Sequence, residues 1–157
     1  YHGKWHLGDE IYAQHGYENF VSIEDYYTEY YSEKRDKSDR SDYHHYLLNE
    51  GFSLGTGDSF PREFASQLPE RYGKPKFVAD HARDFIRRNR HHPWMLTVNL
   101  LEPHMPFYSC RDGQYPPEDV PLFSNFDHIP DEAPESQPLP GVIRDRLRRS
   151  PGSLFRS

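Results

Sequence analysis

Hydrophobic residues recur with the period of a helix over residues 75–90. Four of them fall at positions i, i+4, i+7 and i+8: Val78, Ala82, Phe85 and Ile86. This spacing places them on one face of an α-helix, and Phe77 lies beside them. Pro75 suits the first helical position. The pattern predicts an amphipathic helix over 75–90.

Residues 94–101 read Trp-Met-Leu-Thr-Val-Asn-Leu-Leu, which is hydrophobic almost without alternation. Such a run is typical of a strand that is covered on both faces. A helix, a short loop and a buried strand in this order predict an α/β fold. In α/β sheets, ligands bind beyond the carboxyl ends of the strands. We therefore expect Glu102, Pro103 and His104 to lie at the functional edge of a sheet.

Two shorter helices are predicted upstream, over residues 24–34 and 42–49. In the first, Ser22 is the expected N-cap, and four tyrosines would share one face: Tyr26, Tyr27, Tyr30 and Tyr31. This face is expected to pack against the body of the domain, although a surface that stacks sugars is the alternative. Residues 51–74 are rich in Gly, Ser and Pro, and we expect no element there longer than a turn. A stretch of this kind suggests an insertion on the substrate side.

Residues 3–8 read Gly-Lys-Trp-His-Leu-Gly. If this segment is extended or in a turn, Lys4 and His6 point the same way, and Trp5 and Leu7 point into the core. Lysine supplies a fixed charge and three donors, and histidine supplies a donor or a proton. The pair is thus a candidate site for a tetrahedral oxyanion.

The composition narrows the possible functions. The formal net charge of −6 gives no basic footprint for nucleic acid. The single cysteine, Cys110, excludes an internal disulfide framework. No hydrophobic run approaches the length of about 20 residues that spans a bilayer. Residues 106–140 are a proline-rich coil, and 141–157 are a basic tail that we expect to be poorly ordered.

Two segments carry a family resemblance. Residues 1–8 resemble the second signature of the sulfatases, and residues 102–107 (Glu-Pro-His-Met-Pro-Phe) resemble the Pro-His-x-Pro-Phe segment that follows a central strand in that family. The similarity extends from Tyr1 to about Phe126. It implies a partial sheet of the alkaline-phosphatase-like superfamily, with flanking helices, over residues 1–140. Because Tyr1 already lies inside a motif, we expect the chain to be an internal segment of such an enzyme.

The resemblance implies hydrolysis of sulfate esters on a sulfated small molecule or glycan. Lys4 would bind the sulfate and a formylglycine nucleophile. His6 would hydrogen-bond the formylglycine hydrate as a catalytic residue. His104 would contact the ester oxygen, both as a substrate-binding residue and as the proton donor. A periplasmic, secreted or lysosomal location is compatible with the family.

The sequence departs from the family in two respects. The nucleophile motif Cys/Ser-x-Pro/Ala-x-Arg is absent, and the surroundings of Cys110 do not match it. Sulfatases usually hold Ca²⁺, yet no segment here provides its ligands, and the chain alone is expected to have no turnover. Two alternatives stay open. One is a phosphonate or phosphate ester hydrolase of the same superfamily, and the other is a non-catalytic module that binds glycans or proteins through the tyrosines and the coil.

Overall fold

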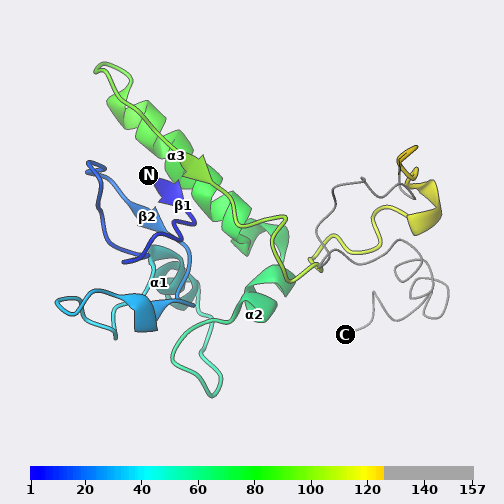
Figure 1. The fold of residues 1–157 in the computed structure, drawn as a ribbon, viewed down its shortest axis with the longest axis horizontal. Coiled ribbons are helices and arrows are strands. Elements are labelled where there is room, and N and C mark those ends of the chain that lie inside the picture. Colours follow the sequence, from blue (N-terminus) through cyan, green and yellow to red (C-terminus); the bar gives the residue numbers. More distant parts are fainter. Residues whose placement is uncertain (126–157) are drawn as a thin grey trace. The chain divides into compact units, whose positions relative to one another are not determined.

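A computed structural model describes residues 1–125, in which two short strands are followed by three α-helices and then by a third strand (Figure 1). The strands are β1 (His2–Gly3), β2 (Val21–Ser22) and β3 (Val98–Asn99), and the helices are α1 (Asp42–Asn49), α2 (Arg62–Gln67) and α3 (Lys74–Asn89). Single 3₁₀ turns occur at Thr28–Tyr30, Glu70–Tyr72 and Pro117–Asp119. The predicted α/β class is confirmed at this level.

The chain divides into two units, Tyr1–Cys110 and Arg111–Ser157. The first unit contains the sheet and all three α-helices. The described part of the second unit, residues 111–125, is exposed and irregular apart from the turn at Pro117–Asp119, as the proline-rich composition predicts. The remainder of the predicted coil and the tail at 141–157 lie outside the described residues.

The three strands form a parallel sheet in the order β2-β1-β3. His2 lies between Val21 and Val98 in the register of the sheet, and Gly3 lies between Ser22 and Asn99. Because all strands are parallel, the segments that follow them leave from the same edge of the sheet. The residues after Gly3 and those after Asn99 therefore begin at one place in the fold.

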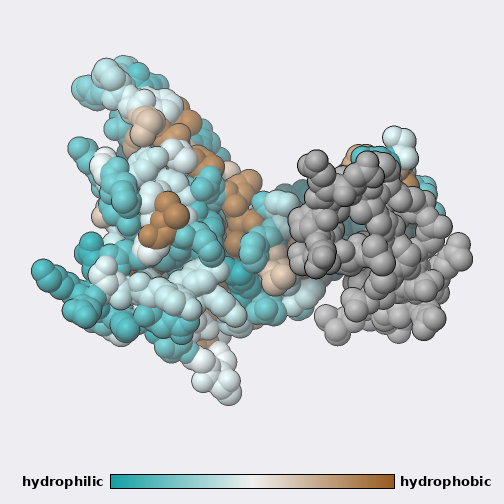
Figure 2. Space-filling view, in the orientation of Figure 1, coloured by the Kyte–Doolittle hydropathy of each residue, from teal (hydrophilic) through white to brown (hydrophobic). Residues whose placement is uncertain are grey.

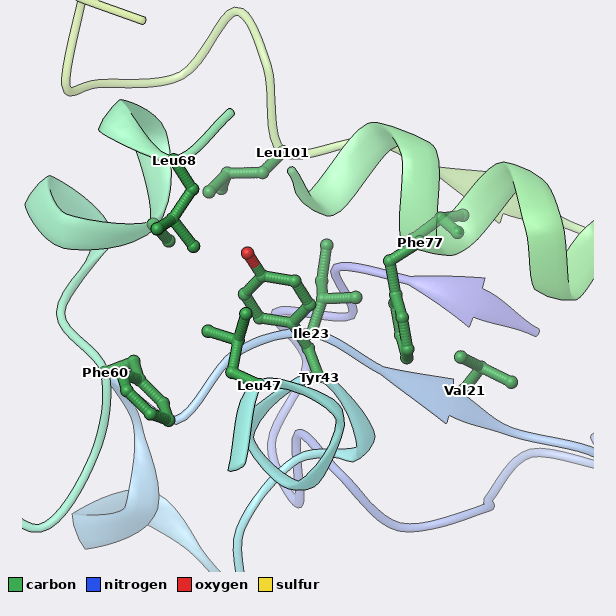
Figure 3. Close-up of a cluster of buried hydrophobic side chains, with 10 residues drawn as sticks. Val21, Ile23, Tyr43, Leu47, Phe60, Leu68, Phe77 and Leu101 are labelled. Carbon is green, nitrogen blue, oxygen red and sulfur yellow. The ribbon is translucent and has the colours of Figure 1, made fainter. Parts of the chain in front are cut away.

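The hydrophobic core lies where β2, α1, α2 and α3 meet, and aromatic residues contribute much of it (Figure 3). Leu47 of α1 and Val78 of α3 are fully buried in this cluster. Tyr43 packs edge-on against Phe77, with ring centroids 5.4 Å apart. These contacts hold α1 and α3 together, and burial of each large side chain stabilises the fold by about 1.5–3 kcal/mol.

Two helices were predicted correctly from local signals. The helix over 42–49 has the predicted bounds, and its N-cap is Ser41, whose side chain accepts a hydrogen bond from the backbone N–H of His44 (3.1 Å). The helix over 75–90 is α3, displaced by one residue. Its hydrophobic stripe is buried at Phe77 and Val78, whereas Ile86 in the last turns is exposed.

The helix predicted over 24–34 is wrong, since only Thr28–Tyr30 forms a 3₁₀ turn there. Its carboxylates are bound elsewhere, because Asp25 accepts hydrogen bonds from the backbone N–H and the hydroxyl of Ser41. Ser22 is a residue of β2 and not a helix cap. The four tyrosines do not share one face: Tyr31 is buried, while Tyr26 and Tyr30 are exposed.

Two further predictions were also wrong. Residues 51–74 contain α2, which forms because Ala65 and Leu68 pack into the core. Residues 94–101 are not a strand covered on both faces, because only Val98–Asn99 forms a strand there and both residues are exposed. Met95 is 72% exposed. Figure 2 shows hydrophobic residues at the surface in the region where Figure 1 draws α3 and β3.

Candidate functional site

The segment that follows β1 is a tight turn and not an extended strand. The backbone is left-handed at His6 (φ 67°) and at Gly8 (φ 88°). A left-handed histidine costs of order 1–3 kcal/mol, so other contacts must hold it in place. The prediction that Leu7 points into the core is wrong, because its side chain is 73% exposed. Trp5 does turn inward, and it packs edge-on against Tyr1 with ring centroids 4.7 Å apart.

The carboxylate of Glu10 holds this turn. Its Oε1 accepts hydrogen bonds from Lys4 Nζ (3.1 Å) and from the backbone N–H of Trp5 (2.8 Å). Its Oε2 accepts a hydrogen bond from the backbone N–H of His6 (2.8 Å). Both side chains of the ion pair are buried, with exposed fractions of 11% for Lys4 and 2% for Glu10.

Lys4 and His6 converge on the ring of Tyr27. Lys4 Nζ lies 4.0 Å from the centroid of this ring, within the range of a cation–π interaction. The His6 ring meets the same tyrosine edge-on, with centroids 5.0 Å apart. The structure thus brings the two predicted residues to one place. Both of them contact the ring of Tyr27.

A cavity of about 410 Å³ opens at this place. It is lined by His6, Gly8, Asp9, Glu10, Tyr27 and Tyr30. Burial lowers the pKa of the Lys4 amine, and the charge and hydrogen bond of Glu10 offset this effect only in part. The cavity lining therefore combines an imidazole and two tyrosines with the carboxylates of Asp9 and Glu10, and the Lys4 ammonium reaches this lining through its ion pair with Glu10.

A second charged cluster contacts Tyr27 through the side chain of Arg62. The carboxylate of Glu24, which is 1% exposed, forms ion pairs with Arg62 (Nε at 2.7 Å) and with Lys74. Nη2 of Arg62 lies 3.5 Å from the hydroxyl of Tyr27. Burial by itself raises the pKa of Glu24, but the charges and hydrogen bonds of Lys74 and Arg62 outweigh it and hold that pKa below its ordinary value.

The charges of the two clusters do not cancel. Three cations, Lys4, Arg62 and Lys74, face two carboxylates, Glu10 and Glu24. One positive charge is therefore in excess in these two clusters, whereas the cavity lining itself carries two carboxylates, Asp9 and Glu10, and neither lysine nor arginine.

His104 follows β3 and so starts from the same edge of the sheet as Lys4. The backbone N–H of Lys4 donates to the carbonyl of Asn99 (3.1 Å), which joins the two segments. His104 itself is exposed, its backbone N–H donates to Leu101, and its Nδ1 lies 3.0 Å from the carbonyl oxygen of Met105. Within residues 1–125, its contacts are thus local ones, and no hydrogen bond joins it to Lys4 or His6.

The described residues do not fit a calcium site. Calcium takes roughly six to eight oxygen ligands. Residues 1–125 contain no group of three or more His, Cys, Asp or Glu side chains that could hold a metal ion. Glu10 and Glu24, the buried carboxylates nearest the cavity, are already bound to Lys4, Arg62 and Lys74. Cys110 is an exposed free thiol.

Sequence reasoning missed the residues that build the surroundings of Lys4 and His6. Glu10 lies two residues after the motif of residues 3–8, and this proximity could have indicated that it pairs with Lys4. Arg62 and Lys74 gave no such signal, because they reach Glu24 across 38 and 50 positions of the chain.

No helix among residues 1–125 is both long and hydrophobic enough to cross a bilayer. Neither family models, nor curated proteins, nor solved structures include a match to this chain.

Proposed function

We propose that this chain forms part of the active site of a sulfate-ester hydrolase and binds the sulfate group. The observation that carries the proposal is the convergence of Lys4 and His6 on Tyr27, beside a cavity of about 410 Å³. The resemblance of residues 1–8 and 102–107 to two sulfatase segments supports it.

Each residue has a chemical task in this proposal. The ammonium of Lys4 compensates the negative charge on the non-bridging oxygens of the sulfate group. The imidazole of His6 donates a hydrogen bond to the same group. His104 protonates the oxygen of the leaving alcohol as a general acid. To act as this acid, His104 must move closer to Lys4 and His6, because its contacts in the described structure are with its own segment.

The proposal separates binding from turnover. The chain contains no Cys/Ser-x-Pro/Ala-x-Arg motif, so the 157 residues supply no formylglycine nucleophile of the kind the family uses. We therefore expect the purified chain to bind sulfate and to leave aryl sulfates intact. Hydrolysis of 4-nitrophenyl sulfate by the purified chain would contradict this division of the site.

Sulfate binding is the direct test. The chain, labelled with ¹³C and ¹⁵N, is titrated with sodium sulfate while the side-chain signals of Lys4 and His6 are followed by NMR. Sodium chloride at equal ionic strength controls for screening, because salt alone weakens surface electrostatics. Saturable shifts at Lys4 and His6 that sulfate causes and chloride does not are the expected result.

Two variants sharpen the titration. Lys4→Met removes the charge and keeps a chain of similar length, and it should abolish the sulfate-dependent shift at His6. Lys34→Met removes the same charge from an exposed residue outside the cavity and should leave it unchanged. Equal loss in both variants, or no saturation in the wild type, would refute the proposal. Inorganic phosphate serves as a second ligand, and its relative affinity distinguishes a sulfatase from a phosphoryl-transfer enzyme.

A further inference from the structure

One buried carboxylate serves three consecutive residues at the candidate site. Glu10 accepts hydrogen bonds from the side chain of Lys4 and from the backbone N–H groups of Trp5 and His6, at distances of 2.8–3.1 Å. Its own side chain is 2% exposed, so water does not compete for these donors. A charged acceptor makes such bonds shorter and stronger than a neutral one does.

The turn depends on these bonds more than on local preference. His6 has a left-handed backbone, which a histidine adopts only when its surroundings favour it. The N–H groups of Trp5 and His6 lie in this turn, where they make no bonds to a neighbouring strand, so Glu10 is their acceptor. A buried N–H without an acceptor is costly, so loss of Glu10 would favour another conformation of the segment.

Lys4 also depends on Glu10, because its other neighbours do not supply a free negative charge. The Tyr27 ring lies 4.0 Å from Nζ, and Arg62 adds a positive charge nearby. Glu24 is negative but is bound to Arg62 and Lys74. Glu10 uses one of the three donors of the ammonium, which leaves two N–H groups for further acceptors.

We infer that Glu10 is the positioning residue of this site: its carboxylate holds the Lys4 ammonium and the turn at Trp5 and His6 so that the lysine and the histidine face one anion. The assignment of the anion as a sulfate group rests on the proposed function. The positioning of Lys4 and His6 by Glu10 is a claim about the free protein.

The electrostatic consequence has a definite sign. Burial lowers the pKa of Lys4, whereas the charge of Glu10 and its hydrogen bond raise it. Glu24 raises it further, and Arg62 lowers it. Removal of the Glu10 charge should therefore lower the pKa of Lys4 beyond the effect of burial, and Lys4 would lose its proton at a lower pH.

The test measures the titration of Lys4 in the full chain without any anion ligand. Glu10→Gln keeps the volume and one acceptor oxygen but removes the charge, and it should shift the midpoint of the Lys4 ¹³Cε signal to a lower pH. Glu18→Gln removes the same charge from an exposed side chain and should leave the midpoint unchanged. A purely structural role for Glu10 would lower the melting temperature and leave the Lys4 midpoint in place, and that result would overturn the inference.

A second measurement needs no variant and covers the case in which Glu10→Gln does not fold. In the wild type, the backbone amides of Trp5 and His6 should exchange slowly with solvent, because both donate to the carboxylate of Glu10. Fast exchange at both amides would overturn the inference.

Sulfate titration then distinguishes this inference from the proposed function. A lowered Lys4 midpoint in Glu10→Gln together with sulfate binding by the wild type supports both. A lowered midpoint without any sulfate binding supports the role of Glu10 and refutes the proposed function.

Discussion

Gly3 approaches Asn99 so closely that a Cβ atom on Gly3 would lie 1.8 Å from the carbonyl oxygen of Asn99. The φ angle of Gly3 is 122°, which side chains rarely allow. This contact joins β1 to β3 and brings the segment of Lys4 beside the segment of His104. A glycine at the start of the motif is therefore a requirement of the sheet as well as of the site.

Gly3→Ala should destabilise the fold strongly, by about 3 kcal/mol or more, because the strain of the backbone adds to the clash with Asn99. Urea unfolding followed by circular dichroism measures the change. Gly55→Ala is the matched control, since a Cβ at Gly55 meets no atom within 4 Å. Equal midpoints for the two variants would contradict the close contact between β1 and β3.

Glu24→Gln should cost about 3–5 kcal/mol at pH 7, because it leaves Arg62 and Lys74 buried without a counter-charge. The pKa of Glu24 is lowered in the folded state, so its contribution is fully present above about pH 4.5 and is lost as pH falls through the folded pKa. The difference between wild type and variant should therefore shrink in acid. Glu63→Gln on the exposed face of α2 is the control, and a similar loss in both would exclude a special role for the Glu24 cluster.

His44 should make stability depend on pH near neutrality. Burial lowers its pKa, with a smaller opposing effect from Asp25. As pH falls below about 6.5, His44 binds a proton in the unfolded chain but stays neutral in the folded chain, so the free energy of unfolding decreases. His2, which is also buried with a lowered pKa, contributes in the same direction.

His44→Asn should reduce the slope of unfolding free energy against pH between 7.5 and 5.5, whatever its effect on stability at one pH. Urea titrations at four pH values give this slope. His92→Asn changes an exposed histidine and should retain the wild-type slope. An unaltered slope in His44→Asn would show that His44 is not the titrating group.

Tyr27 should act through its ring and not through its hydroxyl. Tyr27→Phe keeps the face that lies 4.0 Å from Lys4 and loses only the contact of 3.5 Å with Arg62, so sulfate affinity should stay close to that of the wild type. Tyr27→Ala removes the ring and should weaken sulfate binding by about 2- to 30-fold, the range of a cation–π interaction. Calorimetric titration compares the three proteins, and equal weakening in Phe and Ala variants would assign the effect to the hydroxyl.

In a sulfate-ester hydrolase that contains this chain, as the proposed function requires, Lys4→Ala should reduce the turnover of an aryl sulfate by about two to three orders of magnitude, because one positive donor to the sulfate group is lost. Steady-state rates with 4-nitrophenyl sulfate test this expectation. Lys34→Ala is the control. Unchanged turnover in Lys4→Ala would remove the lysine from the mechanism.

Helices could be predicted from the sequence where a capping residue and the hydrophobic period within the segment itself stabilise the helix. The helix over 42–49 has its cap at Ser41 and its hydrophobic residues in helical period, so its bounds were predictable. The helix that became α3 was predictable for the same reason. The helix predicted over 24–34 failed because Asp25 and Glu24 are bound to Ser41, Arg62 and Lys74, which lie far along the chain.

The sequence by itself determined that Lys4, His6 and His104 follow the carboxyl ends of strands. The parallel pairing of β1 with β3 places these two ends at the same edge of the sheet. Only the tertiary structure decided how Lys4 and His6 meet: Glu10 binds the N–H groups of Trp5 and His6, which bends the segment, and Tyr27 provides the surface on which both side chains rest. The physical reason is that a buried charge stabilises whichever conformation supplies its partners, and those partners are chosen by the fold and not by neighbours in the chain.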